Sequence, residues 1–270
     1  MARLMDLSII AHKYNFMAIE SWCDDLLLHH CIGGIDFLSK CSASQMEVLA
    51  DIASRRQAGD FLQIIQNEWL GRLKTRALSI SHALLVGERH NWRAFLGKAY
   101  YEQLRQLRLS HTGGALQVLN LDKTNLNEQQ RYRLLHGFCS LSMFWDTLVK
   151  RRFRKASANL STSSSSWSHH RDGAGCKNNM PKIWDFLWAE VLKGQSAGII
   201  VGDVLGNLTY MMERAPSVVG NECCQNHILK RVQSIHDDLS EDLVDHFLGP
   251  NDEVNELVAG DSEVDIDLSV

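Results

Sequence analysis

The sequence predicts an all-α protein of stacked, solenoid-like helical hairpins, followed by a second helical subdomain and a disordered acidic tail. Three observations support this class. Apolar residues recur with helical spacing along most of the chain. The 270 residues include only three prolines, which leaves few breaks for an all-β fold rich in tight turns. The hydrophobic fraction of 45% and the charged fraction of 22% are ordinary for a globular protein.

Composition also limits the cell compartment and the kinds of partner that we expect. No apolar run approaches the roughly 18 residues that a membrane span needs, and the first residues show no signal-peptide core. We therefore expect an intracellular protein, cytoplasmic or nuclear, without a membrane partner. Its seven cysteines are then expected to be reduced thiols, most of them in the core. The net charge is −4, and residues 250–270 hold seven acids and no base, so the rest of the chain carries +3. A body with so small a net charge has no general electrostatic attraction to nucleic acid, so a nucleic-acid partner is not favoured.

The first expected element is a hairpin of two helices that breaks at Asn15. Apolar residues share helical spacing before and after the break: Leu7, Ile10, Ala11 and Tyr14, then Phe16, Ile19, Cys23, Leu26 and Leu27. Because each helix has one apolar face, the hairpin leaves a face for another element to cover.

A related pattern recurs around Asn91. Aligning Asn15 with Asn91 pairs Tyr14 with His90, Phe16 with Trp92, Ala18 with Ala94, and Ile19 with Phe95. A third break is expected near residue 54, between apolar segments at 48–54 and 61–73. The breaks near 15, 54 and 91 have the spacing of hairpin repeats in α-solenoids. An irregular all-α domain is the alternative.

Five regions follow from these patterns. They are the hairpin region 1–113, a linking helix region 114–155, a Ser-rich flexible loop 156–180, a helical subdomain 181–249 and the acidic tail 250–270. In the linking region, Asn127 precedes a buried helix with apolar residues from Leu134 to Leu148.

Three helices are expected in the subdomain. The first begins at Pro181 and contains Trp184 and Trp188. The second covers about 199–212. The last has apolar residues at steps of three or four and ends at Gly249-Pro250, with the stripe Ile228, Val232, Ile235, Leu239, Leu243 and Phe247.

A basic run ends the linking helix. Five of six residues are cationic, namely Lys150, Arg151, Arg152, Arg154 and Lys155. We interpret the run as favourable charge at a helix C-terminus. A nuclear-import or nucleic-acid patch is the alternative.

The sequence has no G-x-S-x-G elbow, no phosphate loop ending in GKS or GKT, no G-x-G-x-x-G and no H-E-x-x-H, so we expect a non-enzymatic protein without a cofactor. A structural zinc is the remaining chemical hypothesis. Its ligands would be His169, His170 and Cys176 in the Ser-rich loop, with Cys223 of the adjacent pair Cys223-Cys224. Their spacing matches no standard zinc finger, which favours plain loop or core residues.

In the tail, Val264, Ile266 and Leu268 alternate with acidic residues. An extended segment of this kind can add to the edge of a partner's sheet. The pattern is similar to SUMO-interaction motifs, so a SUMO-like partner is one hypothesis, and a solubilising tail is the favoured alternative.

The opening hairpin resembles the last helical hairpin of BTB/POZ domains. The pattern consists of Ala11, Tyr14, Phe16, Ile19 and Cys23. Further stretches, in order, resemble the helical C-terminal region of fungal (basidiomycete-type) BTB-domain proteins: Ile9–Trp22, Ala83–Leu104, Arg131–Trp145, Gly175-Cys176 and Asp203–Gly206.

The helical region is also similar to the BACK-type extensions of these proteins, so the resemblance implies BACK-like stacked hairpins and an adaptor that contacts other proteins. The mixed sheet that precedes this hairpin in BTB domains is missing from the sequence, so the family's dimerisation and cullin-binding surfaces are not transferred. We therefore expect a protein–protein interaction or adaptor protein with an unidentified protein partner. The alternative is a nuclear or nucleic-acid-associated factor that uses Lys150–Lys155.

Overall fold

A computed structural model describes residues 2–33, 35–56, 59–107, 109–112, 116–119, 121, 125–157, 182–189, 191, 203–219 and 222–250. The chain forms two compact units, residues 1–132 and 133–270, and each is described by itself. The predicted all-α class is confirmed, with one addition. Strands β1 (Leu109–Thr112) and β2 (Leu116–Leu119) form a short antiparallel hairpin in which Leu109 lies opposite Leu119.

Unit 1 contains seven described helices ahead of the strands. They are α1 (Ala2–Lys13), α2 (Met17–Gly33), α3 (Ile35–Lys40), α4 (Ala43–Arg56), α5 (Gly59–Lys74), α6 (Ile80–Arg89) and α7 (Arg93–Gln106). Six of them pair as antiparallel neighbours: hairpin 1 is α1–α2, hairpin 2 is α4–α5 and hairpin 3 is α6–α7. The expected breaks at Asn15 and Asn91 are confirmed, and so is the expected break near residue 54, since α4 ends at Arg56 and α5 begins at Gly59.

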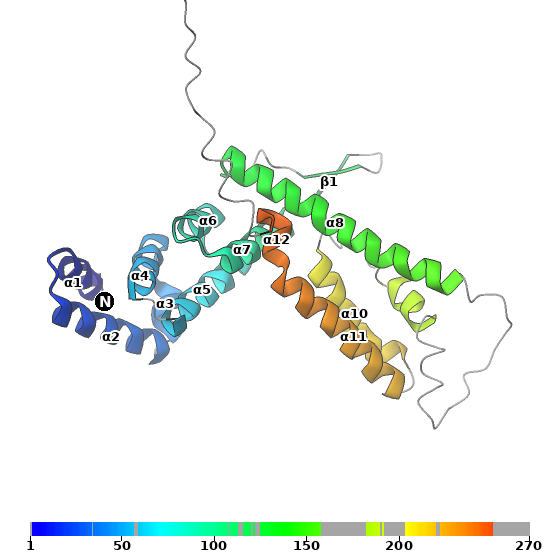
Figure 1. Ribbon diagram of the computed structural model, residues 1–270, viewed down its shortest axis with the longest axis horizontal. Coiled ribbons are helices and arrows are strands. Elements are labelled where there is room, and N and C mark those ends of the chain that lie inside the picture. The colour runs from blue at the N-terminus through cyan, green and yellow to red at the C-terminus, as the bar shows by residue number, and fades with distance from the viewer. Residues whose placement is uncertain are drawn as a thin grey trace, which may run out of the picture. The chain divides into compact units, whose positions relative to one another are not determined.

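The three hairpins contact one another in chain order. Helix α4 packs between α1 and α6, and α5 packs against both α2 and α7 (Figure 1). First helices therefore form one layer and second helices the other. The interior includes the fully buried side chains of Phe61, Ile65 and Trp69 on α5, because each helix turns one apolar face inward.

The turns of hairpins 1 and 3 have the same backbone geometry. Asn15 and Asn91 have positive φ angles of 58° and 53°. The amide of Phe16 donates to the carbonyl of Ala11, and the amide of Trp92 donates to that of Gly87, at 2.8 and 2.9 Å. A left-handed residue with this hydrogen bond is a Schellman-type helix end, which asparagine tolerates better than most residues do.

The apolar stripes expected in hairpin 1 are only partly buried. Ala11 of the first stripe is buried, together with Met5 and Ser8 of α1. Other members of the stripes are largely exposed, with exposed fractions of 39% for Leu7, 49% for Ile10, 61% for Tyr14, 53% for Phe16 and 43% for Ile19. The physical reason is a buried polar pair, in which the Ser8 hydroxyl donates to Asp24 Oδ1 at 2.7 Å. This bond satisfies the two polar groups, so a face containing serine and aspartate packs inside while an apolar face remains outside. Cys23 and Leu27 of α2 are buried as predicted.

Helix α8 (Glu128–Ser157) begins where the sequence predicts. Asn127 and Gln130 form a reciprocal capping box, since each side-chain oxygen accepts a hydrogen bond from the other residue's amide, at 2.8 and 3.2 Å. The expectation of a buried helix holds for one face only. Leu134, Leu141 and Trp145 are buried on that face, whereas the exposed fractions of Leu135 and Met143 are 43% and 70%.

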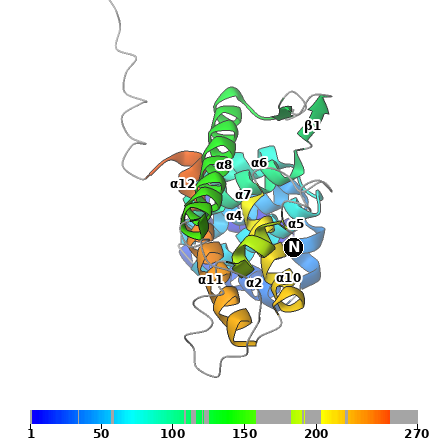
Figure 2. The ribbon, with the colours of Figure 1, turned by 90° about the vertical axis from the view of Figure 1, so that its right-hand side faces the viewer.

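The remaining helices of unit 2 follow most of the predicted pattern. Residues 182–189 are helical, and Trp184 and Trp188 are buried there as expected. Helix α10 (Val204–Val218) begins later than the predicted 199–212, because Asp203 caps it by accepting a hydrogen bond from the Gly206 amide at 3.0 Å. It also extends six residues beyond the predicted end. It lies beside α11 (Glu222–Glu241), as Figure 2 shows.

The predicted last helix is two helices. Helix α11 ends at Glu241 and α12 (Leu243–Leu248) follows after Asp242. The whole predicted stripe is nevertheless buried: Ile228, Val232, Ile235, Leu239, Leu243 and Phe247. Gly249, with a φ of 77°, ends α12 as expected.

Candidate functional site: the terminal face of hairpin 1

Hairpin 1 exposes an apolar surface that we call the terminal face. Of the fourteen large hydrophobic side chains that are exposed in the described part of the chain, nine lie between residues 7 and 32. We define the terminal face by the six that fall on one side of the hairpin, which are Leu7, Ile10, Tyr14, Phe16, Ile19 and Trp22. Their exposed fractions range from 39% to 61%. A contiguous apolar surface of this kind marks a contact site more often than scattered residues do.

Helical spacing places these residues together. Leu7, Ile10 and Tyr14 are three and four residues apart along α1, and Ile19 and Trp22 are three apart along α2, so each set lies along one side of its helix. The rings of Tyr14 and Phe16 lie 6.3 Å apart across the turn.

The opposite side of hairpin 1 faces hairpin 2. Glu20 lies 3.7 Å from Arg55 of α4, and Asp25 pairs with Arg56. Glu20 also contacts His12 at 2.9 Å. These contacts fix which side of hairpin 1 meets α4, and the terminal face is therefore the open end of the row of hairpins.

Hairpin 3 shows what the corresponding positions do when another hairpin covers them. Aligning the Asn15 and Asn91 turns matches Leu7, Ile10 and Ile19 with Ala83, Val86 and Phe95, and these three residues are buried. The Phe95 ring meets the ring of Trp69, from α5 of hairpin 2, at 6.2 Å and an interplanar angle of 66°. The same positions thus form an interhairpin contact in hairpin 3, whereas no described helix packs over them in hairpin 1.

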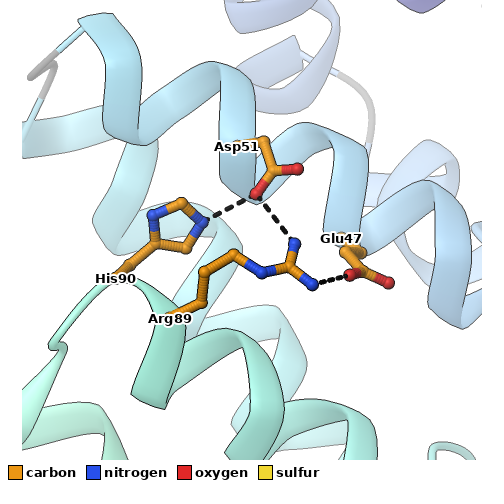
Figure 3. Close-up of polar contacts among 4 residues, drawn as sticks. All are labelled: Glu47, Asp51, Arg89 and His90. Carbon is orange, nitrogen blue, oxygen red and sulfur yellow. Dashed lines mark hydrogen bonds and ion pairs between the residues drawn. The ribbon is translucent and has the colours of Figure 1, made fainter.

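A charged cluster joins hairpins 2 and 3 (Figure 3). His90 Nε2 lies 2.7 Å from Asp51 Oδ1, and Arg89 donates to Glu47 at 2.7 Å and lies 3.5 Å from Asp51. The hydrogen bond to Glu47 raises the pKa of the Arg89 guanidinium above its ordinary value. The His90 ring stacks on Trp92, with centroids 5.1 Å apart.

Beside this cluster lies a groove of about 420 Å³ between α1, α4 and α6, lined by Ile9, Val48, Asp51, Ile52, Arg55, Arg89 and His90. Its charged groups neutralise one another: Asp51 faces Arg89 and His90, and Arg55 faces Glu20. The arrangement therefore fastens neighbouring hairpins and does not present a nucleophile with a base. Glu47, Asp51 and Arg89 were not among the residues predicted from the sequence to form a site. Two acids four residues apart on α4, with an Arg-His pair before the Asn91 break, were the available signal.

The sequence-predicted metal ligands are not brought together among the described residues. His169, His170 and Cys176 lie outside the described residues, and Cys223 lies in α11 without a described side chain. Within the described ranges, no group of three or more His, Cys, Asp or Glu residues is placed to hold a metal ion. The tail residues Val264, Ile266 and Leu268 also lie outside the description.

The basic run falls in the last turns of α8, which ends at Ser157. The side chains of Lys150, Arg151, Arg152, Arg154 and Lys155 lie outside the described set, so their arrangement stays a prediction.

Of the four cysteines whose side chains are described, three follow the prediction of a buried thiol. Cys23, Cys31 and Cys41 are buried free thiols, whereas Cys139 is exposed on α8. Burial is the main reason that the pKa of Cys31 rises to about 12, so this thiol is kept protonated and unreactive. These three residues act as small core side chains.

Comparison with known proteins adds no relative. No protein-family model matches the sequence, no curated protein matches it, and no solved structure matches the fold. Among the described helices, none is long and apolar enough to cross a membrane.

Proposed function

We propose that this chain is a non-enzymatic interaction protein that binds another protein through the terminal face, in the manner of an adaptor. The observation that supports this proposal is the exposure of Leu7, Ile10 and Ile19 at positions that hairpin 3 buries against hairpin 2. The resemblance of residues 9–22 to the last BTB hairpin agrees with a contact role.

The size of the terminal face fits this role. A large side chain has a surface of roughly 200 Å². With the exposed fractions of its six members, the face offers roughly 600 Å² of side-chain surface. That area is at the upper end of the largest apolar patch on a typical monomer, about 300–600 Å². Covering it would remove apolar surface from water and favour association.

Site-specific photo-crosslinking tests the proposal. A photoreactive amino acid replaces Trp22 in one variant and Leu85 of α6 in a matched control, because both side chains are 55% exposed in unit 1. Irradiation in the native cell is expected to give a discrete protein adduct from position 22 and none from position 85. Absence of an adduct at position 22, or the same adducts from both positions, would contradict the proposal.

A second candidate function rests on the basic run. Helix α8 continues through residues 150–155, so five of six successive residues on this helix are cationic. Binding of nucleic acid through this run would weaken steeply with added salt. Alanine at all five positions would abolish that salt-sensitive binding. Equal binding by the variant would remove this candidate.

A further inference from the structure

We propose that the terminal face of one copy is covered by the terminal face of a second copy of this chain, which gives a two-fold symmetric dimer. This inference rests on the proposed function, because it names the partner for the same surface.

The first reason is the kind of surface that covers equivalent positions within the chain. In hairpin 3, Phe95 meets Trp69 of the neighbouring hairpin edge to face. Ile19 occupies the Phe95 position in hairpin 1 and is 43% exposed, with Trp22 beside it at 55%. A helical hairpin that presents aromatic and aliphatic side chains is therefore the matching occupant, and the terminal face itself is such a surface.

The second reason is area. Each partner in a stable interface of standard size contributes about 800 Å². The six side chains of the terminal face supply roughly 600 Å² per copy. Polar residues around them would supply the rest, which corresponds to an apolar centre with a polar rim.

The third reason is that the opposite end of the row does not match. Hairpin 3 has one exposed large apolar side chain among its described residues, Leu85. That end therefore offers little exposed apolar surface to match the terminal face. A two-fold arrangement pairs the terminal face with itself and closes the assembly at two copies.

Charge along α1 agrees with this symmetry. Asp6 and Lys13 are exposed and lie seven residues apart, on the same side of α1, with Ile10 between them. Two copies of α1 that cross in antiparallel fashion near Ile10 place Asp6 of one copy opposite Lys13 of the other. The two symmetry-related Asp6–Lys13 pairs then bring opposite charges together across the interface, which favours this register over a parallel one.

Sedimentation equilibrium of the full chain tests the dimer. The wild-type chain and Leu85→Asp are expected to sediment as dimers, and Trp22→Asp as a monomer with an unchanged helical circular dichroism spectrum. A wild-type chain that is monomeric at about 100 μM, a concentration at which even a weak interface associates, would overturn the dimer. So would a Trp22→Asp variant that dimerises as the wild type does.

A charge exchange tests the two-fold register. Asp6→Lys alone and Lys13→Asp alone are each expected to weaken dimerisation roughly tenfold, because two exposed pairs per dimer become repulsive. The double exchange is expected to restore the wild-type dissociation constant. Additive loss in the double variant would overturn this arrangement.

The two proposals fail separately. A monomeric wild-type chain whose position 22 still crosslinks to a different protein rejects the dimer and retains the interaction role. A monomer without any adduct at position 22 rejects both.

Discussion

Asn15 and Asn91 end the first helices of hairpins 1 and 3 in the same left-handed backbone conformation, with φ angles of 58° and 53°. The equivalence sets the register in which the hairpins are compared. In that register, Ile19 of hairpin 1 corresponds to Phe95 of hairpin 3, and these residues are 43% and 2% exposed. The position that hairpin 3 buries is therefore uncovered by the described residues in hairpin 1.

The left-handed conformation at Asn91 predicts a sharp residue dependence. Asn91→Gly is expected to keep wild-type stability, since glycine adopts positive φ without steric cost. Asn91→Val is expected to lower the free energy of unfolding by about 1–2 kcal/mol or more, because a β-branched residue is strained there. Urea unfolding monitored by circular dichroism measures both. Equal stability of the valine and glycine variants would show that this turn is not left-handed.

The buried Ser8–Asp24 pair predicts a pH effect. Burial raises the pKa of Asp24 above its ordinary value, while the hydrogen bond from Ser8 acts in the lowering direction. Because the folded pKa exceeds the unfolded one, the folded state binds the proton more tightly, and this group's contribution to stability falls as pH rises through the interval between them.

Asp24→Asn keeps an acceptor for Ser8 and cannot ionise. The free energy of unfolding of the variant, relative to the wild type, is expected to increase between about pH 3 and about pH 7, a range that contains the ordinary aspartate pKa. Urea unfolding at the two pH values measures this difference. A difference that is independent of pH would exclude Asp24 as a group with a raised pKa.

Gly87 lies where α6 approaches α7. A Cβ at this position would lie 2.7 Å from Cδ2 of Leu96 and 3.1 Å from Cδ1 of Phe95. Gly87→Ala is therefore expected to lower the free energy of unfolding by about 1–3 kcal/mol.

Gly71→Ala on α5 is the matched control, because no atom lies within 4 Å of its Cβ position. This variant is expected to gain up to about 1 kcal/mol from the higher helix propensity of alanine. Thermal unfolding of both variants measures their stability relative to the wild type. A stabilising effect of alanine at both positions would contradict the close approach of α6 and α7.

The cluster that joins hairpins 2 and 3 predicts energetic coupling between His90 and Asp51. His90 Nε2 lies 2.7 Å from Asp51 Oδ1, and the exposed fractions of the two side chains are 18% for His90 and 41% for Asp51. A double-mutant cycle with Asp51→Asn and His90→Gln is expected to give a coupling free energy of about 0.5–1 kcal/mol in favour of the native pair. Additive effects of the two substitutions would mean that the contact does not link the hairpins.

Some elements could be predicted because their signal lies within a single helix, either as an apolar stripe or as a capping residue. The stripe from Ile228 to Phe247 is buried throughout, and Asn127 begins α8 through its capping box with Gln130. The positions of the turns at Asn15 and Asn91 were also predictable, because asparagine between two apolar helical patterns favours a break.

Tertiary pairing determined what the patterns could not predict. Ser8 is polar on its own and becomes a core residue only when Asp24 accepts its hydrogen bond, at a separation of sixteen residues. With Ser8 on the buried side, Ile10 lies on the exposed side of α1, so the most apolar stripe of this helix is not its buried one. The β1–β2 hairpin was likewise unexpected, because four-residue strands give too little alternation to be recognised.

Side-chain footprinting with hydroxyl radicals tests the terminal face most directly. Tyr14 and Trp22 of this face are compared with Tyr132, which is 69% exposed on α8. All three are expected to be oxidised in dilute purified protein, and Tyr14 and Trp22 are expected to be selectively protected when the same protein is labelled in its native cell. Equal labelling of the three residues under both conditions would contradict the assignment of this face as an interaction surface.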